Sequence, residues 1–317
     1  MAITTPAGSS RRDFIRLTGT LGMAAGLAAS LAACGGKGTT SGGAKTSGSA
    51  MATDQEVTHK DGVITAGISY ELGTNGYDPM TTSSALTVAA NWHTLEGLTE
   101  LHPATREVYA ALASEMPKKV DDTTYEVALR KDAKFSDGAA VTADDVVFSF
   151  TRVLDPANKS LYSQFLPFID KVEAKDASTV TIKLKYAFSL VAERLSVVKI
   201  VPKAIVEADA KAFDMNPTGS GPYKMTDNGA ASQKVVFERN DSYNGPRPAL
   251  AKSMTWQVLP DDTTRTNAMS SGSVQAIDAV SAANLSTLKD PVKVAAQQGF
   301  GLLFAMFNNT TFSNVKA

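Results

Sequence analysis

The segment "KFSDGAAVTADDVVFSFTRVLDP", residues 134–156, carries the densest local signals for structure in this chain. Asp137-Gly138 is a turn signal, and Thr142 with Asp145 has the spacing of a capping box at the start of a helix. Apolar residues then recur at helical spacing until Pro156, which cannot continue a helix. The segment therefore predicts a turn followed by an amphipathic helix.

The adjacent acids Asp144 and Asp145 have two possible interpretations, a pair of catalytic carboxylates or residues that start the helix. Both lie in the expected first turn, where a carboxylate is stabilised by the positive end of the helix dipole. A structural role explains both residues, so we expect no catalytic role for them.

Short runs of alternating apolar and polar residues lie on both sides of this helix and predict strands. Every second residue is apolar in "TYEVALR", residues 124–130, and in "TVTIKLK", residues 179–185, which is typical of a strand buried on one face. Helices are expected from Ser83 or Ser84 to Leu98 and from about Asp262 to Ser271. Together these elements predict an α/β fold of mixed α+β character. The other expected strands cover residues 63–69, 234–240, 253–259 and a segment that begins at residue 274.

Two local patterns add expectations about side chains. The first of the flanking helices has Val88, Trp92 and Leu95 at helical spacing, which predicts its buried face. The segment "NPTGSGPYKM", residues 216–225, lacks the Lys-Ser/Thr pair and the helix start of a phosphate-binding loop. We expect a tight turn that presents Tyr223.

The composition excludes some classes of partner. The 317 residues have room for roughly two domains, and 43% hydrophobic residues are enough to bury a core. The 31 basic and 32 acidic residues leave a formal net charge of −1. Nucleic-acid binding depends on a marked positive excess, so no nucleic-acid partner is expected.

A search for catalytic and metal-binding patterns finds none that is complete. The three histidines, His59, His93 and His102, do not have the spacing of metal ligands, and a single cysteine excludes Cys-x-x-Cys motifs. Nucleophile-elbow, Walker and calcium-loop patterns are also absent from the sequence. We expect no metal, no cofactor and no enzyme; the alternative is a secreted hydrolase of unrecognised type.

The first 33 residues have the parts of an export signal. Arg11 and Arg12 precede a weakly apolar run, residues 17–33, that is too short and too polar to span a bilayer. The stretch "SRRDFIRL" resembles the twin-arginine signal pattern, which directs folded proteins to export. The alternative is an ordinary basic region for the general export route.

Cys34 is the single cysteine and follows "LAA", so that "LAAC" resembles the bacterial lipobox. In a lipobox the cysteine receives a diacylglyceryl group and becomes the mature N-terminus, and two acyl chains anchor a protein firmly. The alternative is a small buried cysteine. The Gly/Ser/Thr-rich residues that follow can bury almost nothing, so we expect lipidated Cys34 to anchor the chain to a membrane and residues 34–55 to be a flexible linker.

The order of several motifs resembles family 5 of the solute-binding proteins of ABC transporters, the oligopeptide, dipeptide and nickel type. The resemblance covers residues 63–317. Its motifs are "EGL" at 96–98, "F-x-DG" at 135–138, "T-A-x-DV" at 142–146, "GSGPY" at 219–223, "ERN-x-x-Y" at 238–243 and "FNNTTFSNV" at 307–315.

This resemblance implies a two-lobed type II periplasmic binding protein with an extra subdomain beside the first lobe. It implies a non-enzymatic, extracytoplasmic monomer that holds a solute between its lobes and docks on ABC permease subunits. A peptide is the expected solute, although relatives also carry nickel, haem, opines and sugars. The first lobe is expected over residues 56–262 and the start of the second over 263–317, with most of the second lobe missing; a truncated, non-functional fragment is the alternative.

The loop after the first strand is expected to approach the solute, as it does in the family. The acidic residue that pairs with a peptide's amino terminus in the family has no counterpart in this chain. Trp92 and Tyr223 could instead be packing aromatics, and Glu71 an exposed acid. The expected contacts are Tyr70, Glu71, Thr74, Asn75 and Tyr77 in or beside the loop, Trp92 on the facing helix, and Ser220 and Tyr223 in the glycine turn.

Overall fold

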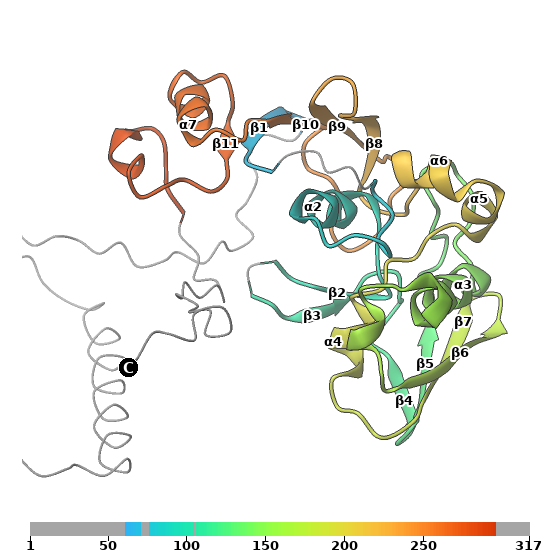
Figure 1. The fold of residues 1–317 in the computed structure, drawn as a ribbon. Helices are drawn as coiled ribbons and strands as arrows, with labels where there is room; N and C mark the ends of the chain where they lie inside the picture. The colour runs from blue at the N-terminus through green and yellow to red at the C-terminus, as the bar shows by residue number, and fades with distance from the viewer. Residues whose placement is uncertain (1–60, 71–75, 104, 296–317) are drawn as a thin grey trace, which may run out of the picture. The chain divides into compact units, whose positions relative to one another are not determined.

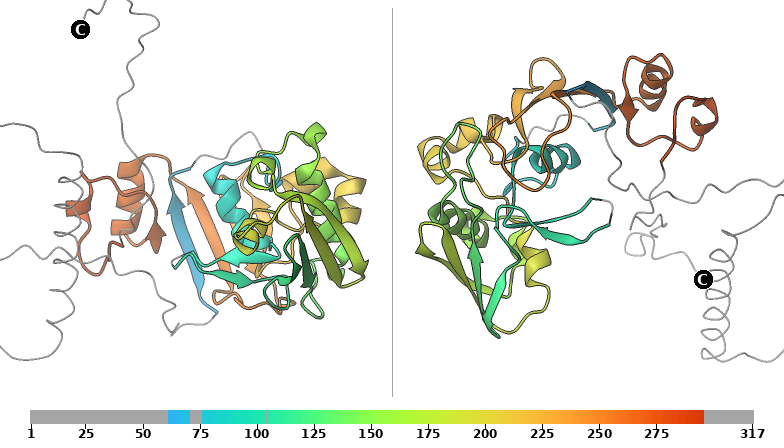
Figure 2. Two further views of the ribbon diagram at one scale, coloured as in Figure 1. Left: turned by 90° about the horizontal axis from the view of Figure 1, so that it is seen from below. Right: turned by 180° about the vertical axis from the view of Figure 1, so that it is seen from behind.

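A computed structural model describes residues 61–70, 76–103 and 105–295 (Figures 1 and 2). All of them belong to one compact unit, residues 49–317. Several predicted features therefore lie outside the described residues. These are the export signal with Arg11 and Arg12, Cys34 and its linker, the loop residues Glu71, Thr74 and Asn75, and the motif at 307–315.

A five-stranded sheet in the order β11-β1-β10-β9-β8 is the frame of the fold. Strand β1 lies second in this order and is parallel to both neighbours, with Ala66 opposite Trp256 on one side and Ala276 on the other. Figure 2 shows the blue β1 next to the orange β10. The other pairs are antiparallel. The strands are β1 (Val63–Ile68), β8 (Tyr223–Asn228), β9 (Lys234–Arg239), β10 (Ser253–Val258) and β11 (Ala276–Ile277).

This sheet continues across the domain boundary expected between residues 262 and 263. Helix α7 (Asp262–Ser270) and β11 follow that boundary, and β11 pairs with β1. The helix was predicted almost to the residue. The expected boundary does not coincide with a break in the sheet, because the ladder between β1 and β11 extends it to Ile277.

A four-stranded antiparallel sheet in the order β4-β5-β7-β6 packs against helix α3 (Ala143–Leu154). Val180, Ile182 and Leu184 are buried, as their alternation predicted, and Val146 and Phe150 of α3 belong to the same core. The spacing of apolar residues therefore predicted the buried faces of both the strands and the helix correctly. The strands are β4 (Lys118–Asp121), β5 (Thr124–Ala128), β6 (Ile169–Asp176) and β7 (Thr179–Leu184).

Helix α3 begins at the predicted cap. The backbone N–H and the hydroxyl of Thr142 donate to Asp145 Oδ2 over 2.9 and 2.8 Å. The other carboxylate oxygen of Asp145 accepts from the backbone N–H of Lys203 at 2.9 Å, at the start of helix α5 (Lys203–Ala208). Asp145 thus has a structural role, as the sequence indicated.

Helix α2 (Ala85–Thr94) differs from its prediction in length and in its buried face. It ends before the expected Leu98 because Leu95 has an extended backbone. Its buried side chains include Leu86 and Ala90, whereas Trp92, predicted on the buried face, is 46% exposed. The prediction followed the largest apolar residues, but the sheet packs on the face with smaller ones.

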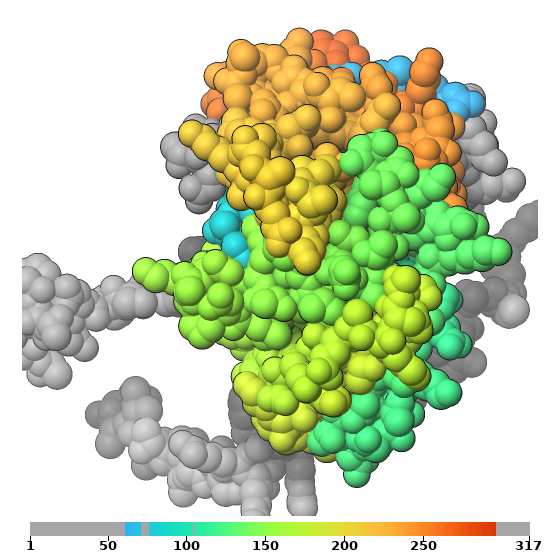
Figure 3. All heavy atoms as spheres, turned by 90° about the vertical axis from the view of Figure 1, so that its right-hand side faces the viewer, coloured from blue at the N-terminus to red at the C-terminus, as the bar shows by residue number. Residues whose placement is uncertain are grey.

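Helices α5 and α6 (Ala210–Met215) lie between the two larger sheets. In Figure 3 the yellow atoms of this part of the chain lie between the orange and the green atoms. Asp214 accepts hydrogen bonds from the backbone N–H groups of Tyr77 at 2.7 Å and Asp78 at 2.8 Å. The remaining elements are β2 (Thr99–Leu101), β3 (Val108–Ala110), α4 (Val191–Leu195), η1 (Pro156–Asn158), η2 (Ser163–Phe165) and η3 (Leu285–Thr287).

No helix among the described residues is long and apolar enough to cross a membrane.

Candidate functional site

The carboxyl ends of the parallel strands β1, β10 and β11 meet at one edge of the five-stranded sheet. The chain leaves β1 toward the side of β8, β9 and β10, and after β10 it returns to β11 on the other side of β1. In open α/β sheets, ligands bind outside the carboxyl ends of the strands, where successive connections diverge in this way. The topology therefore places a candidate site at this edge.

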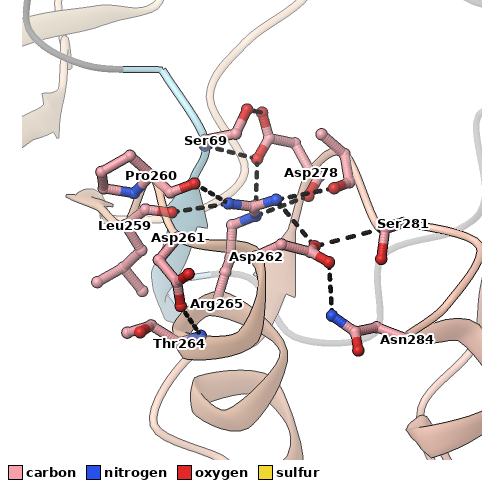
Figure 4. A network of polar contacts seen from close by, with 11 residues as sticks. Ser69, Leu259, Pro260, Asp261, Asp262, Thr264, Arg265, Asp278, Ser281 and Asn284 are labelled. Atoms are coloured by element: carbon pink, nitrogen blue, oxygen red, sulfur yellow. Dashed lines mark hydrogen bonds and ion pairs between the residues drawn. The ribbon is translucent and has the colours of Figure 1, made fainter.

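A buried arginine ties the ends of β10 and β11 together (Figure 4). Arg265 of α7 is 3% exposed, and its guanidinium donates to the carbonyls of Leu259 at 2.8 Å and Pro260 at 3.1 Å, just after β10. The same group donates to the carbonyls of Asp278 at 3.0 Å and Ala279 at 2.8 Å, just after β11. One side chain thus satisfies four carbonyls from two strand ends.

The Asp278 carboxylate adds the end of β1 to this network (Figure 4). Its two oxygens accept from the backbone N–H and from the hydroxyl of Ser69, both at 2.8 Å. Arg265 Nε lies 3.6 Å from Asp278 Oδ1, so the two side chains also form an ion pair. The end of β1 at Ser69 is therefore fixed by polar contacts.

A second acid, Asp262, partners the arginine from the start of α7. Its Oδ1 accepts from Arg265 Nη2 at 3.1 Å, and its Oδ2 accepts from the side-chain amide of Asn284. Hydrogen bonding from Ser281 holds the pKa of the Asp262 carboxyl below its usual range. The buried cation therefore has carboxylate partners on both sides, which offsets the cost of burying its charge.

A cavity of about 190 Å³ lies between helix α2, strand β2 and the residues after α4. Val88, Asn91 and Trp92 line it from one face of α2, at spacings of three and four residues. Most of the surface of the cavity is apolar. The apolar lining residues are Pro79, Val88, Trp92, Leu101 and Val197.

Two charged residues at the cavity neutralise each other. Glu100 and Lys199 form an ion pair, and their side chains are only 12% and 8% exposed. The Glu100 carboxylate also accepts from the backbone N–H of Gly97 at 2.7 Å. Because the pair is satisfied internally, the lining residues carry no net charge.

The predicted contact residues do not gather on one surface. Tyr70, at the end of β1, and Trp92, at the cavity, are exposed, whereas Tyr77, Ser220 and Tyr223 are buried. The hydroxyl of Tyr77 donates to the Asn228 carbonyl at 2.7 Å, and burial raises the pKa of Tyr77 to about 12. The hydroxyl of Tyr223 donates to a carbonyl of Ala251 at 3.1 Å. Both tyrosines belong to the core under the five-stranded sheet.

The glycine turn therefore does not present Tyr223, and that expectation was wrong. A Cβ on Gly219 would lie 2.0 Å from the carbonyl oxygen of Thr94, and one on Gly221 would lie 2.5 Å from that of His93. The two glycines allow the turn to pack directly against the end of α2, and the Gly221 N–H donates to the Thr94 carbonyl at 2.9 Å. Close backbone approach, rather than display of a side chain, explains the motif.

Residues of the "EGL" and "ERN-x-x-Y" motifs meet in a buried polar contact. Arg130 donates to Glu96 over 3.2 and 3.0 Å, and the hydroxyl of Tyr243 donates to Glu96 Oε1 at 3.0 Å. Burial raises the pKa of the Glu96 carboxyl even though Arg130 and Tyr243 oppose that change. These motif residues connect distant segments of the chain, so their role here is structural.

Reasoning from the sequence missed Ser69, Arg265 and Asp278 at the strand ends, and the ion pair of Glu100 and Lys199 at the cavity. The contact of Ser69 with Asp278 joins residues 209 positions apart and that of Glu100 with Lys199 joins residues 99 positions apart, whereas Arg265 donates to carbonyls 5 to 14 positions away. The only local signal was the single arginine in a polar helix. The described residues include no group of three or more side chains that could hold a metal ion.

Comparisons with known proteins agree with this architecture. The family described as "Bacterial extracellular solute-binding proteins, family 5 Middle" matches residues 107–317. Protein XP55 of Streptomyces lividans is 34% identical over 170 residues, which are 52% of this chain and 31% of XP55. The glutathione-binding protein GsiB of Pectobacterium atrosepticum is 30% identical over 224 residues, 68% of this chain and 41% of GsiB.

A solved structure of a binding protein has a similar fold. The oligopeptide-binding protein AppA from Bacillus subtilis, in complex with a nonapeptide, is similar with a TM-score of 0.61 at 26% identity. The similarity covers 68% of this chain and 43% of AppA. The type II periplasmic binding-protein architecture expected from the sequence is thus confirmed. The chain spans between 31% and 41% of the length of the curated relatives XP55 and GsiB.

Proposed function

This chain belongs to family 5 of the bacterial extracellular solute-binding proteins, and from that premise we propose that it is the lipid-anchored solute receptor of an ABC importer and that its solute is a peptide. The receptor binds and releases its solute without chemical change. It works as a monomer with ABC permease subunits. The observation that carries the proposal is the arrangement at the carboxyl edge of β1, β10 and β11, where a polar network ties the three strand ends together.

The network supports a binding role because it fixes backbone where a ligand would arrive. Ser69 donates two hydrogen bonds to the Asp278 carboxylate, and Asp278 is held in turn by Arg265. A loop that leaves a fixed strand end loses less conformational freedom when it closes on a solute, which improves affinity. The opposite wall of the site would close by a hinge motion, as in other binding proteins of this type.

Peptide is the proposed solute because two relatives point to it by name. AppA is an oligopeptide-binding protein and GsiB a glutathione-binding protein, and both share more than a quarter of their aligned residues with this chain. We propose Tyr70, Glu71, Thr74 and Asn75 as contacts on the loop and Trp92 as a contact on α2. Tyr77, Ser220 and Tyr223, which the sequence also suggested as contacts, are buried and would support the site from within the fold.

The proposal includes export and anchoring. Arg11 and Arg12 would direct export of the folded chain, and Cys34 would carry the lipid. Incorporation of a radioactive fatty acid tests the anchor: label is expected in the wild-type chain and not in Cys34→Ala. Label that persists in Cys34→Ala would rule out this anchor.

Solute binding is tested by thermal melting and calorimetry of the full chain with di- and tripeptides, a nickel chelate and a sugar panel. A peptide at a hundred times its Kd adds about 2.7 kcal/mol of stability by mass action. For a domain of this size that corresponds to a rise in Tm of about 5–10 °C. A Tm shift with the chelate or a sugar alone would refute the peptide as solute, and no shift with any of them would refute the receptor.

A further inference from the structure

Ala279 has a left-handed backbone, with a φ of 47°, just after strand β11. A residue with a Cβ rarely adopts this conformation, because the Cβ then crowds the backbone. Such residues persist where the surrounding contacts hold them, and they cluster at functional sites. Ala279 is exposed, so the packing of its own side chain does not explain the conformation.

The other non-glycine residues with a left-handed backbone, among those that the structure describes, have different settings. Arg106 lies between the antiparallel strands β2 and β3, Gln233 lies between β8 and β9, and Lys159 ends η1. Left-handed residues are common in hairpin loops and at the ends of helices. Two more are aspartates, a residue type that tolerates this conformation. Ala279 fits none of these settings, because it follows an edge strand whose neighbour β1 is parallel to it.

Arg265 holds this backbone from inside the fold (Figure 4). Its Nη2 donates to the Ala279 carbonyl at 2.8 Å, and its Nε donates to the Asp278 carbonyl at 3.0 Å. On the other side of Ala279, the backbone N–H of Ser281 donates to Asp262 Oδ1 at 3.5 Å. Polar contacts therefore hold the chain before and after Ala279, and they offset the cost of its conformation.

The left-handed turn ends the ladder between β11 and β1. The register of the ladder pairs Gly67 with Ile277. Two residues further along, Ala279 would lie opposite Ser69 if the ladder continued. The Ser69 N–H would then donate to a backbone carbonyl of the neighbouring strand. It donates instead to the Asp278 carboxylate at 2.8 Å, so a side chain takes the place of the strand.

We propose that Ala279 is a positioning residue of the solute site, whose left-handed turn directs the chain away from the end of β1 and leaves Tyr70 open to the solute. Tyr70 follows Ser69 and is 50% exposed. An extended residue at position 279 would continue β11 beside Ser69 and bring the next residue alongside Tyr70. This inference rests on the proposed function, because it assumes that a solute arrives at the strand ends.

Two substitutions at position 279 separate the backbone conformation from the side chain. Asparagine tolerates the left-handed conformation, whereas a β-branched valine strongly disfavours it. Position 279 is exposed, so neither side chain has to fit into the core. Calorimetry of the full chain uses trialanine and the other tripeptides of the binding panel. Ala279→Val is expected to bind about tenfold more weakly than both the wild type and Ala279→Asn.

Lys159→Val is the control for a loss of stability alone. Lys159 is exposed, has a φ of 50°, and ends η1, outside the contacts of Arg265. Valine there meets the same backbone conflict, so thermal melting is expected to show a similar fall in Tm for the two valine variants. The Kd of Lys159→Val is expected to stay within about twofold of the wild type, because distant sites act independently.

Three outcomes overturn the inference while the proposed function stands. The first is a wild-type Kd for Ala279→Val. The second is an equal loss of affinity in Ala279→Val and Ala279→Asn, which would assign the effect to the side chain at this position. The third is an equal loss in Lys159→Val, which would assign it to lower stability. No binding of any of these peptides to the wild type overturns the proposed function and this inference together.

Discussion

The four-stranded sheet and the carboxyl edge of the five-stranded sheet are stabilised by different forces. In the first, α3 and the strands bury a continuous apolar core that includes Phe150, Val180 and Ile182. In the second, a single buried arginine and its acids tie three strand ends through hydrogen bonds. The apolar core stabilises the fold by burying side chains, whereas the polar network holds backbone groups at the ends of strands. The difference separates residues that stabilise the fold from residues that would position the candidate site.

The largest expected effect is a loss of stability when the apolar core of the four-stranded sheet is changed. Phe150 is fully buried against the four-stranded sheet, and Phe150→Ala is expected to lower the free energy of unfolding by about 3–5 kcal/mol. Urea denaturation measures this change. Solute affinity of the folded fraction is expected to stay within about twofold of the wild type, because Phe150 does not reach the candidate site. A large loss of affinity at full folding would mean that the two regions are coupled.

A smaller loss of stability but a larger loss of affinity is expected at the polar edge. Arg265→Lys keeps the charge but cannot serve four carbonyls and two carboxylates, so the free energy of unfolding is expected to fall by about 2–3 kcal/mol. Peptide affinity, measured by calorimetry where the variant is fully folded, is expected to fall about tenfold as the strand ends loosen.

A charge-matched control distinguishes positioning from mere stabilisation. The control is Arg239→Lys, because Arg239 pairs with Asp61 at a more exposed position. The peptide affinity of this variant is expected to equal that of the wild type. Equal affinity losses in the two variants would contradict a positioning role for Arg265.

The smallest expected effect is the pH dependence of stability that arises from His93, on α2 beside the five-stranded sheet. Its ring contacts Tyr223, Phe237 and Trp256, with centroids 5.4–5.9 Å apart, and burial lowers the pKa of His93 to about 4. The unfolded chain therefore binds more protons between pH 4 and 6.5, so stability falls as pH drops below the unfolded pKa. At pH 5 the loss relative to pH 7 is expected to be about 1–2 kcal/mol.

The measurement is urea denaturation at pH 7 and pH 5 of the wild type and of His93→Phe, which keeps an aromatic ring and removes the titrating group. His93→Phe is expected to lose the part of the pH dependence of stability that comes from His93. The carboxylates contribute equally in the wild type and in the variant. An unchanged difference between the two pH values in His93→Phe would show that another group is responsible.

The sequence predicted the region that depends on local patterns. Alternation in β5 and β7 and the Thr142–Asp145 cap specify their structure within a few residues, so the four-stranded sheet and α3 were confirmed. The parallel pairing of β1 and the contact of Ser69 with Asp278 depend on distant segments brought together by folding, and no local spacing reveals them. Trp92 shows the same limit, because its exposure depends on which face of α2 the distant sheet covers.

The parallel register of β1 also determines the order in which the chain can close. Val63 pairs with Ser253, 190 positions later, and Ala66 pairs with Ala276. The strands of the four-stranded sheet lie within residues 118–184, so that sheet can form while the ribosome is still synthesising β10. Pairings between distant segments pay a large loop-closure entropy and form slowly. Strand β1 is therefore synthesised long before either of its partners, and its backbone hydrogen-bonding groups stay unpaired on both sides until late in synthesis.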